Sequence, residues 1–399
     1  MQTIQHRGSI SGIFKHVASG ALALAIILML TIFATQSAPA QTFTVLYSFT
    51  NGTDGGQPYA SLVRDSAGNL YGTTAVGGAS NFGTVFKLKK TGKEIVLYSF
   101  SGGADGANPW AGLVWGPAGS LYGTTEAGGT SGYGTVFKLS TTGKKTVLYN
   151  FTGTGSDGAY PFARLVWDSA GNIYGTTYKG GASGNGTVFK LAKTGKETVL
   201  YSFQGGADGE NPYAGVVRDS AGNLYGTTFG AFGVGYGTVF KLNAARKEKV
   251  LHAFTGGTDG GYPYYGGLVR DSAGNLYGTT SYGGAHQYFG TVFKINKAGK
   301  QTVLYSFTGQ ADGGQPNAGL IRDAAGNLYG TTIGGGASGH GTVFKLDQTG
   351  KETVLYSFTG GTDAADPDAN LLRDAAGNLY GTTIAGGASG GGTVFKLTP

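Results

Sequence analysis

Short apolar runs alternate with polar, glycine-containing turns along nearly the whole chain after residue 42. In one representative stretch, runs rich in β-branched and aromatic residues occur at 60–65, 69–74, 83–88 and 94–100. Each run has the length of a strand, and none shows the 3.6-residue apolar period of a helix. The turn at 65–69 contains a glycine that can take the positive φ of a bulged hairpin. The pattern predicts four antiparallel strands joined by tight turns, with almost no helix.

Three sequence markers recur seven times in a fixed order, which indicates a tandem repeat. Val-Leu-Tyr-Ser-Phe, or a close variant, begins at Val45, Val96, Val147, Val199, Val250, Val303 and Val354. Leu/Ile-Tyr-Gly-Thr-Thr has its tyrosine at Tyr71, Tyr122, Tyr174, Tyr225, Tyr277, Tyr329 and Tyr380. Gly-Thr-Val-Phe-Lys has its phenylalanine at Phe86, Phe137, Phe189, Phe240, Phe293, Phe344 and Phe395. Successive first markers are 51, 51, 52, 51, 53 and 51 residues apart.

The repeated strands carry bulky side chains on both faces, as the run Val96-Leu97-Tyr98-Ser99-Phe100 shows. A single sheet of this kind cannot bury both faces, so the sheets are expected to stack. Four-stranded units of about 40–50 residues that stack radially form a β-propeller. Strand 43–49 has no preceding partners, and strand 392–397 has no fourth strand after it. We therefore predict an all-β, seven-bladed propeller of four-stranded antiparallel blades, closed by strand 43–49 joining the last blade.

The first forty residues differ from the rest. Arg7 and Lys15 precede an apolar run at 21–33, and Ala38-Pro39-Ala40 follows. This order predicts a secretory signal peptide at 1–40 and one propeller domain at 41–399. The alternative is a retained N-terminal anchor, although the apolar run is short for a bilayer. The expected location is secreted or cell-surface, with no membrane contact in the mature form.

Composition narrows the possible chemistry. The chain has no cysteine, which excludes thiol catalysis, cysteine-ligated zinc and iron–sulfur clusters. Its 24 tyrosines and 22 phenylalanines argue against a disordered glycine-rich tract. The net charge of +7 is spread over similar units, and no basic run is interleaved with aromatic residues. We expect a monomer that binds no nucleic acid and needs no cofactor.

Differences between the repeats gather in loops at one end of the predicted blades: just before Gly-Thr-Val-Phe, just after Thr-Thr, and around a recurring proline. Aromatic side chains mixed with amides at these positions suit sugar rings or a peptide. The alternative is that these side chains pack neighbouring loops together. The candidate ligand-binding residues are Tyr59, Phe82, Trp110, Glu126, Tyr133, Phe162, Tyr178, Tyr213, Tyr236, Tyr264, Phe289 and His340.

Other polar residues suggest further functions. A recurring loop aspartate, Asp54 in the first copy, allows a ring of Ca²⁺ sites. An Asx-type turn is the favoured interpretation, because each loop has only one regular carboxylate. His252 replaces a tyrosine and is expected to be packed, whereas Glu126, Asp366 and Asp368 are conceivable acid–base groups. No catalytic or metal-ligating residue is predicted.

Together the markers resemble the GloVer-type tandem repeat of exported bacterial proteins described as choice-of-anchor tandem repeat proteins. The resemblance covers 43–397 and implies a secreted or surface-exposed propeller-like protein, with no reaction to carry over. Members often have a C-terminal anchoring tail, and the end at Pro399 favours a soluble form. The expected function is non-catalytic binding of a glycan or surface protein. The alternatives are a propeller lyase or hydrolase with a site at the central channel, or a structural component of the cell envelope.

Overall fold

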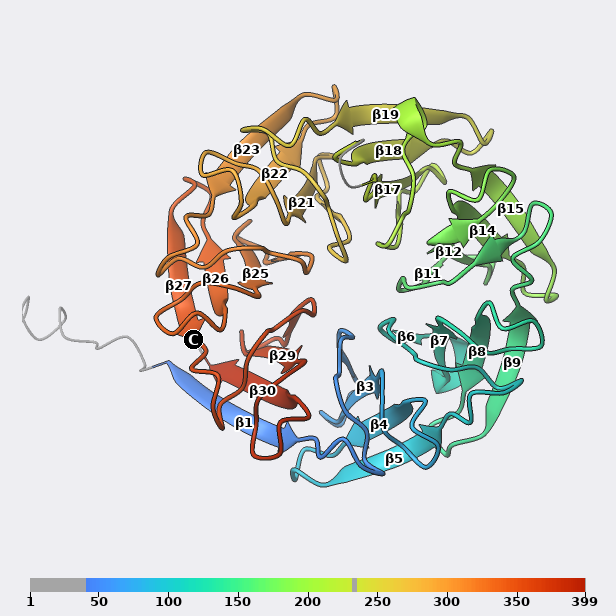
Figure 1. Cartoon of the computed structure of the whole chain (residues 1–399), viewed down its shortest axis with the longest axis horizontal. Helices are drawn as coiled ribbons and strands as arrows, with labels where there is room; N and C mark the ends of the chain where they lie inside the picture. The colour runs from blue at the N-terminus through green and yellow to red at the C-terminus, as the bar shows by residue number, and fades with distance from the viewer. Residues whose placement is uncertain (1–40, 232–234, 399) are drawn as a thin grey trace, which may run out of the picture. The chain divides into compact units, whose positions relative to one another are not determined.

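The computed structural model describes residues 41–231 and 235–398, and residues 42–398 form one compact unit. Seven four-stranded antiparallel sheets of this unit surround a common axis (Figure 1). The seven-bladed propeller is thus confirmed, whereas the predicted signal peptide lies outside the described residues. In the described part of the chain, no helix has the length and hydropathy needed to cross a membrane.

Each blade runs from a short inner strand to a longer outer strand. The innermost strands are β2 (Val63–Arg64), β6 (Val114–Trp115), β11 (Val166–Trp167), β16 (Val217–Arg218), β20 (Val269–Arg270), β24 (Ile321–Arg322) and β28 (Leu372–Arg373). The second strands are β3 (Leu70–Thr74), β7 (Leu121–Thr125), β12 (Ile173–Thr177), β17 (Leu224–Thr228), β21 (Leu276–Thr280), β25 (Leu328–Thr332) and β29 (Leu379–Thr383).

The other two strands of each blade complete the sheet. The third strands are β4 (Thr84–Leu88), β8 (Thr135–Leu139), β14 (Thr187–Leu191), β18 (Thr238–Leu242), β22 (Thr291–Ile295), β26 (Thr342–Leu346) and β30 (Thr393–Thr398). The outer strands are β5 (Glu94–Ser99), β9 (Lys145–Asn150), β15 (Glu197–Ser202), β19 (Glu248–Ala253), β23 (Gln301–Ser306), β27 (Glu352–Ser357) and β1 (Thr42–Ser48).

Three further features are small. β10 (Gly158–Ala159) pairs with β13 (Lys179–Gly180), and the two 3-10 turns are η1 (Pro117–Gly119) and η2 (Gly206–Asp208). The innermost strands are shorter than the predicted run 60–65, because its first residues face the axis instead of pairing within the sheet. Ala60, for example, accepts a hydrogen bond from Thr382 Oγ1 of the preceding blade at 3.2 Å.

The two ends of the described unit close the ring. β1 pairs antiparallel with β30, in a register that runs from Thr42 opposite Thr398 to Ser48 opposite Thr393 (Figure 1). The last blade therefore takes its outer strand from the beginning of the domain, as predicted, and no blade edge is left without its fourth strand.

A pair of phenylalanines joins each blade to the next. Phe86 of β4 and Phe49, which follows the outer strand of the preceding blade, are both fully buried, and their rings meet edge to face at 5.1 Å. The equivalent pairs, at 5.1–5.4 Å, are Phe100–Phe137, Phe151–Phe189, Phe203–Phe240, Phe254–Phe293, Phe307–Phe344 and Phe358–Phe395. These buried contacts hold the sheets face to face.

The glycine of Leu-Tyr-Gly-Thr-Thr makes room for this phenylalanine. Gly72 lies opposite Phe86 in the register of β3 and β4, and a Cβ at Gly72 would come within 2.6 Å of Phe86 Cζ. The ring therefore lies across the backbone of the paired strand. This close approach explains why the glycine and the phenylalanine recur together in every repeat.

Substitution of Phe137 by alanine should lower the free energy of unfolding by about 3–5 kcal/mol, because the ring is fully buried between two blades. Chemical denaturation measures this change. Tyr288→Ala is the control, since Tyr288 is 57% exposed and its loss should change the stability by less than about 0.5 kcal/mol. Equal losses in the two variants would contradict the assigned role of the phenylalanine pair.

In the first six blades, the first residue of the outer strand lies near the preceding loop aspartate. Lys145 Nζ and Gln301 Nε2 donate to the carbonyl oxygens of Asp105 and Asp259. At the same position, Glu94, Glu197, Glu248 and Glu352 each have a buried Oε1 without a hydrogen-bond partner. Burial, followed by the charge of the loop aspartate, raises the pKa of each of these glutamates to about 7.

Glu94→Gln should therefore stabilise the protein at about pH 8 and have little effect at about pH 4. The folded pKa of Glu94 lies above the ordinary value of 4.5. Its contribution is thus fully present below about pH 4.5 and is lost as the pH rises through 7. Denaturation curves over this range measure the effect. The reverse change, Gln301→Glu, should add a further loss of stability between about pH 4.5 and 8, and a profile equal to that of the unchanged protein would refute the explanation.

Candidate ligand-binding face

Two loops of each blade meet at one end of the sheets. The loop that enters the innermost strand pairs with the loop that joins the second and third strands, as Gly56 does with Val76. Corresponding bridges are Ala107–Ala127, Gly261–Tyr282, Gly314–Gly334 and Ala365–Ala385, and β10 with β13 replaces them in the third blade. We call the surface formed by these loops the loop face. It carries all the candidate residues.

The residue before the recurring proline positions this face. It has a left-handed backbone in all seven copies, with φ between 51° and 58°, at Gln57, Asn108, Tyr160, Asn211, Tyr262, Gln315 and Asp366. In the first copy, the N–H of Gln57 donates to the carbonyl of Gly391 in the preceding blade, and its carbonyl accepts from the N–H of Ala75. The three variable positions of the sequence are therefore joined through their backbones.

The candidates just before Gly-Thr-Val-Phe pack between blades. Phe82, Tyr133, Tyr236, Phe289 and His340 each lie against a glycine of the next loop, where any added Cβ would collide with the ring. The glycines are Gly102, Gly153, Gly256, Gly309 and Gly360. Phe82 is nevertheless 39% exposed. These contacts fit the alternative in which the side chains pack neighbouring loops together. Tyr236 also lines a groove of the loop face.

The candidates just after the proline form a row of rings, which we call the aromatic arc: Tyr59, Trp110, Phe162, Tyr213 and Tyr264. Neighbouring centroids along it are 4.0, 6.2, 5.3 and 4.9 Å apart. In the last two blades Asn317 and Asp368 take the same position, so the arc covers five of seven blades. A ring of identical repeats thus becomes asymmetric at its centre.

The two remaining candidates adjoin the arc. Tyr178 stacks on Tyr213, with centroids 4.3 Å apart and planes 26° from parallel. Glu126 lies beside Trp110, and burial raises its pKa while the indole N–H opposes that rise. Of the acid–base candidates, Asp366 and Asp368 are neighbours, whereas Glu126 belongs to another blade. Within the described residues, no three histidine, aspartate or glutamate side chains are grouped as metal ligands.

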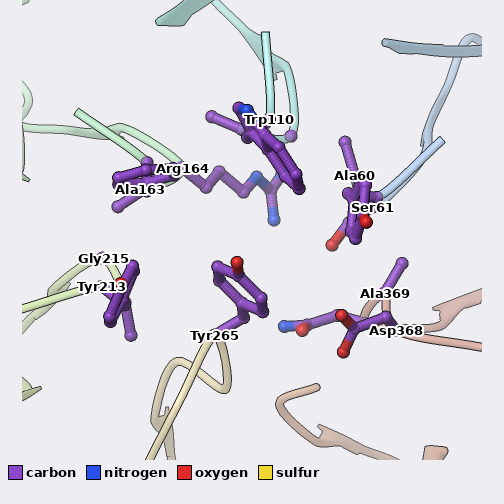
Figure 2. A pocket seen from close by; sticks show the side chains of 16 residues that line it. Ala60, Ser61, Trp110, Ala163, Arg164, Tyr213, Gly215, Tyr265, Asp368 and Ala369 are labelled. Atoms are coloured by element: carbon purple, nitrogen blue, oxygen red, sulfur yellow. The ribbon is translucent and has the colours of Figure 1, made fainter. Parts of the chain in front are cut away.

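A central cavity of about 70 Å³ lies beside the arc (Figure 2). Ser61, Arg164, Tyr265, Asp368 and Asn370 supply its polar groups, and rings of the arc supply apolar walls. Figure 2 shows the Arg164 side chain extending between Trp110 and Tyr265 toward the middle of the cavity. A second cavity of about 450 Å³ shares Arg164, Gly215 and Asn370 with the first, so Arg164 lies where the two meet.

Sequence reasoning missed Arg164. It stands three residues after the recurring proline, where the other copies have Ser61, Gly112, Gly215, Gly266, Gly319 and Asn370. A comparison of this position across the repeats would have identified the single charged residue. Its Nε donates to the carbonyl of Leu113 at 3.2 Å, and enclosure by protein lowers its pKa. Among the described residues, the one ion pair is His252–Asp259, so Arg164 has no carboxylate partner there.

Asp368 is the carboxylate of the cavity. It is only 6% exposed, and its Oδ1 has no hydrogen-bond partner. Burial raises its pKa to about 7, against a hydrogen bond from Asn317, and the nearby Asp366 adds to the rise. Figure 2 shows its carboxyl group directed inward from the rim.

Tyr265 comes from an extra residue in the fifth repeat, which has Tyr264-Tyr265-Gly266-Gly267 where other copies have three residues. The insertion coincides with the loss of one buried hydrogen bond. In other blades the first threonine of Thr-Thr donates to a carbonyl of the next loop, as Thr176 does to Ala214 at 2.9 Å. The equivalent Thr227 precedes the insertion, and its hydroxyl is buried without a partner. The added residue places a phenol at the cavity.

A wider groove opens near the fourth to sixth blades. Its volume is about 470 Å³, and we call it the tyrosine groove. Tyr236, Tyr262, Tyr264 and Tyr282 line it together with Gln315 and Asn317. Rings and amides therefore face the same space, which is the combination expected for this face.

The loop aspartates act in turns. Each accepts a hydrogen bond from a backbone N–H four or five residues earlier, and the acceptors are Asp54, Asp105, Asp157, Asp208, Asp259, Asp312 and Asp363. The loop aspartates thus accept backbone N–H groups, as expected, but from residues that precede them and not from the residue two positions later that defines an Asx turn. His252 occupies a tyrosine position, approaches Asp259 at 3.0 Å and packs edge to face on Phe254, as predicted.

Comparison with protein families finds one repeat model along the chain. The Gloeobacter/Verrucomicrobia repeat matches residues 30–233, 90–288 and 218–399. No curated protein matches the chain.

Solved propellers are similar to the chain at low identity. The extracellular domain of a protein described as a hybrid two-component system from B. thetaiotaomicron has a TM-score of 0.59 and 16% identity, covering 90% of this chain and 42% of that one. A protein described as a 6-phosphogluconolactonase from Bacteroides uniformis has a TM-score of 0.52 and 19% identity, covering 79% and 88%. This chain thus spans about two fifths of the length of the first protein. At these identities the likeness shows the fold alone.

Asp368→Asn should raise the melting temperature at about pH 8 and leave it nearly unchanged at about pH 4. The folded pKa of about 7 exceeds the ordinary 3.8, so the stability from this group is present at low pH and is lost as the pH rises through 7. The uncharged amide avoids that loss. Destabilisation by this substitution at both pH values would show that the carboxyl group has partners not assigned to it here.

Proposed function

The chain belongs to the Gloeobacter/Verrucomicrobia repeat family, and we propose that it is an exported, non-catalytic propeller that binds a glycan through its loop face. The tyrosine groove is the observation that carries this proposal. The fold supports it because the seven blades hold their loops in fixed positions while leaving loop residues free to differ. An extracellular location accords with the predicted signal peptide at 1–40.

The groove has the chemistry that a neutral sugar chain requires. The apolar faces of sugar rings pack on aromatic side chains, and their hydroxyl groups exchange hydrogen bonds with amides and phenols. Tyr264 and Tyr282 offer ring faces, and Gln315 and Asn317 offer amides from the next blade. The groove volume of about 470 Å³ falls within the range of small-molecule sites.

The rings of the groove also pack against one another and against Phe229. Tyr262 is 7% exposed, and its ring packs against Phe229 at 5.0 Å and against Tyr236 at 5.2 Å. Tyr282 contacts Tyr262 at 5.6 Å. Rings held by other rings lose little freedom on binding, which lowers the entropic cost of contact with a flexible sugar chain.

Isothermal titration calorimetry with neutral hexasaccharides tests the proposal. The three hexasaccharides have β-1,4-glucosyl, β-1,4-xylosyl and α-1,4-glucosyl linkages. At least one should bind, and Tyr282→Ala should weaken that binding about tenfold, the effect of about 1.4 kcal/mol. The control is Phe82→Ala, which removes a partly exposed ring from the first blade, outside the groove, and should leave the affinity unchanged. Absence of binding to all three, or an equal effect of both substitutions, would count against a glycan site in the groove.

A further inference from the structure

We infer that the central cavity binds the carboxylate group of a sugar acid, with Arg164 as the residue that recognises the charge. This site goes beyond the proposed neutral-glycan groove. Its polar groups Ser61, Arg164, Asp368 and Asn370 belong to the first, third and seventh blades, and no residue that lines the cavity also lines the groove. Either site can therefore be shown or refuted without the other.

The first argument is the break in symmetry at Arg164. Six of seven equivalent positions carry serine, glycine or asparagine, which leave the axis open and uncharged. The remaining position, in the third blade, carries Arg164, whose side chain extends into the middle of the cavity (Figure 2). The fold does not require an arginine there, because the other blades adopt the same strands without one. A binding role accounts for the exception.

The second argument is that the guanidinium is held in place and unpaired. The Nε–H bond to the Leu113 carbonyl fixes one edge of the group and leaves its terminal N–H groups for another partner. No carboxylate of the described residues lies within ion-pair distance of Arg164. A guanidinium presents two parallel N–H donors that match the two oxygens of a carboxylate. A ligand carboxylate in the cavity would complete this pairing.

The third argument is the buried carboxyl group on the opposite wall. Asp368 Oδ1 is enclosed and has no donor within hydrogen-bond distance. A buried acceptor of this kind favours a ligand that supplies an O–H. A ligand that accepts from Arg164 and donates to Asp368 must carry both an acid and a hydroxyl group. Ser61 and Asn370 add further hydrogen-bonding groups around the same space.

Size and walls favour a sugar acid among such ligands. The cavity holds roughly five water molecules, since each needs about 10–15 Å³ by this measure. That space accommodates a carboxylate with part of a sugar ring. Trp110 and Tyr213 at the wall provide ring faces against which the C–H faces of a pyranose pack. A phosphate has no apolar face to place there.

Calorimetric titration of the whole protein with D-glucuronate, and with D-glucose as its neutral counterpart, tests the inference. Glucuronate should bind at least tenfold more tightly than glucose. Arg164→Gln should abolish that preference, and Arg164→Lys should retain part of it, because lysine keeps the charge without the paired donors. Arg373→Gln is the matched control, since Arg373 is an exposed strand residue outside the cavity. Its preference should equal that of the unchanged protein.

Two further titrations decide between ligand classes. Inorganic phosphate and L-alanine should each bind at least tenfold more weakly than glucuronate. Equal binding of glucose and glucuronate, an unchanged preference in Arg164→Gln, or tighter binding of phosphate or alanine would overturn the inference. Tyr282→Ala should leave glucuronate binding intact, so a failure of the groove proposal stays distinct from a failure here. Arg164→Lys provides the answer if the glutamine variant does not fold.

Discussion

The edge-to-face contact between a phenylalanine of one blade and a phenylalanine of the next is the interaction on which the ring depends. It occurs at all seven blade junctions, always between fully or nearly fully buried rings. The third-strand ring of each pair also needs a glycine on the neighbouring strand, as Phe86 needs Gly72, because no side chain fits between the ring and the backbone. A side chain in place of this glycine would therefore require the phenylalanine to move or change. The apolar clusters between the blades stabilise the ring, and the described residues contain no cysteine that could form a disulfide.

The regular frame leaves the loop face free to vary, and the differences gather near the axis. The left-handed residue before each proline accepts and donates backbone hydrogen bonds in the same way whether it is glutamine, asparagine, tyrosine or aspartate. The loop conformation thus does not depend on the side chain at this position. As a result, five blades present an aromatic ring after the proline, one presents an amide, and one presents a carboxyl group that is almost fully buried.

The proposed groove and cavity use different departures from the repeat. The groove uses substitutions in the fourth to sixth blades, where several tyrosines replace smaller or more polar residues and support one another. The cavity uses two substituted positions, Arg164 and Asp368, and one inserted residue, Tyr265. The insertion leaves the Thr227 hydroxyl without the partner found in most other blades. A buried hydroxyl group without a hydrogen-bond partner lowers the stability of the fold. The insertion is thus present although it costs stability.

The sequence by itself determined the number of blades, the four-stranded pattern, the closure of the ring by strand 43–49 and the acceptance of backbone N–H groups by the loop aspartates. These features depend on local turn chemistry, strand periodicity and repeat count, which a linear pattern records directly. Only the tertiary structure decided which variable residues face a ligand. Phe82 and His340 stand on glycines of the next loop, whereas Tyr264 turns to the groove and Arg164 to the axis. The physical reason is that residues from several blades meet only after the sheets have been arranged radially, so their proximity is not recorded in the spacing of any one repeat.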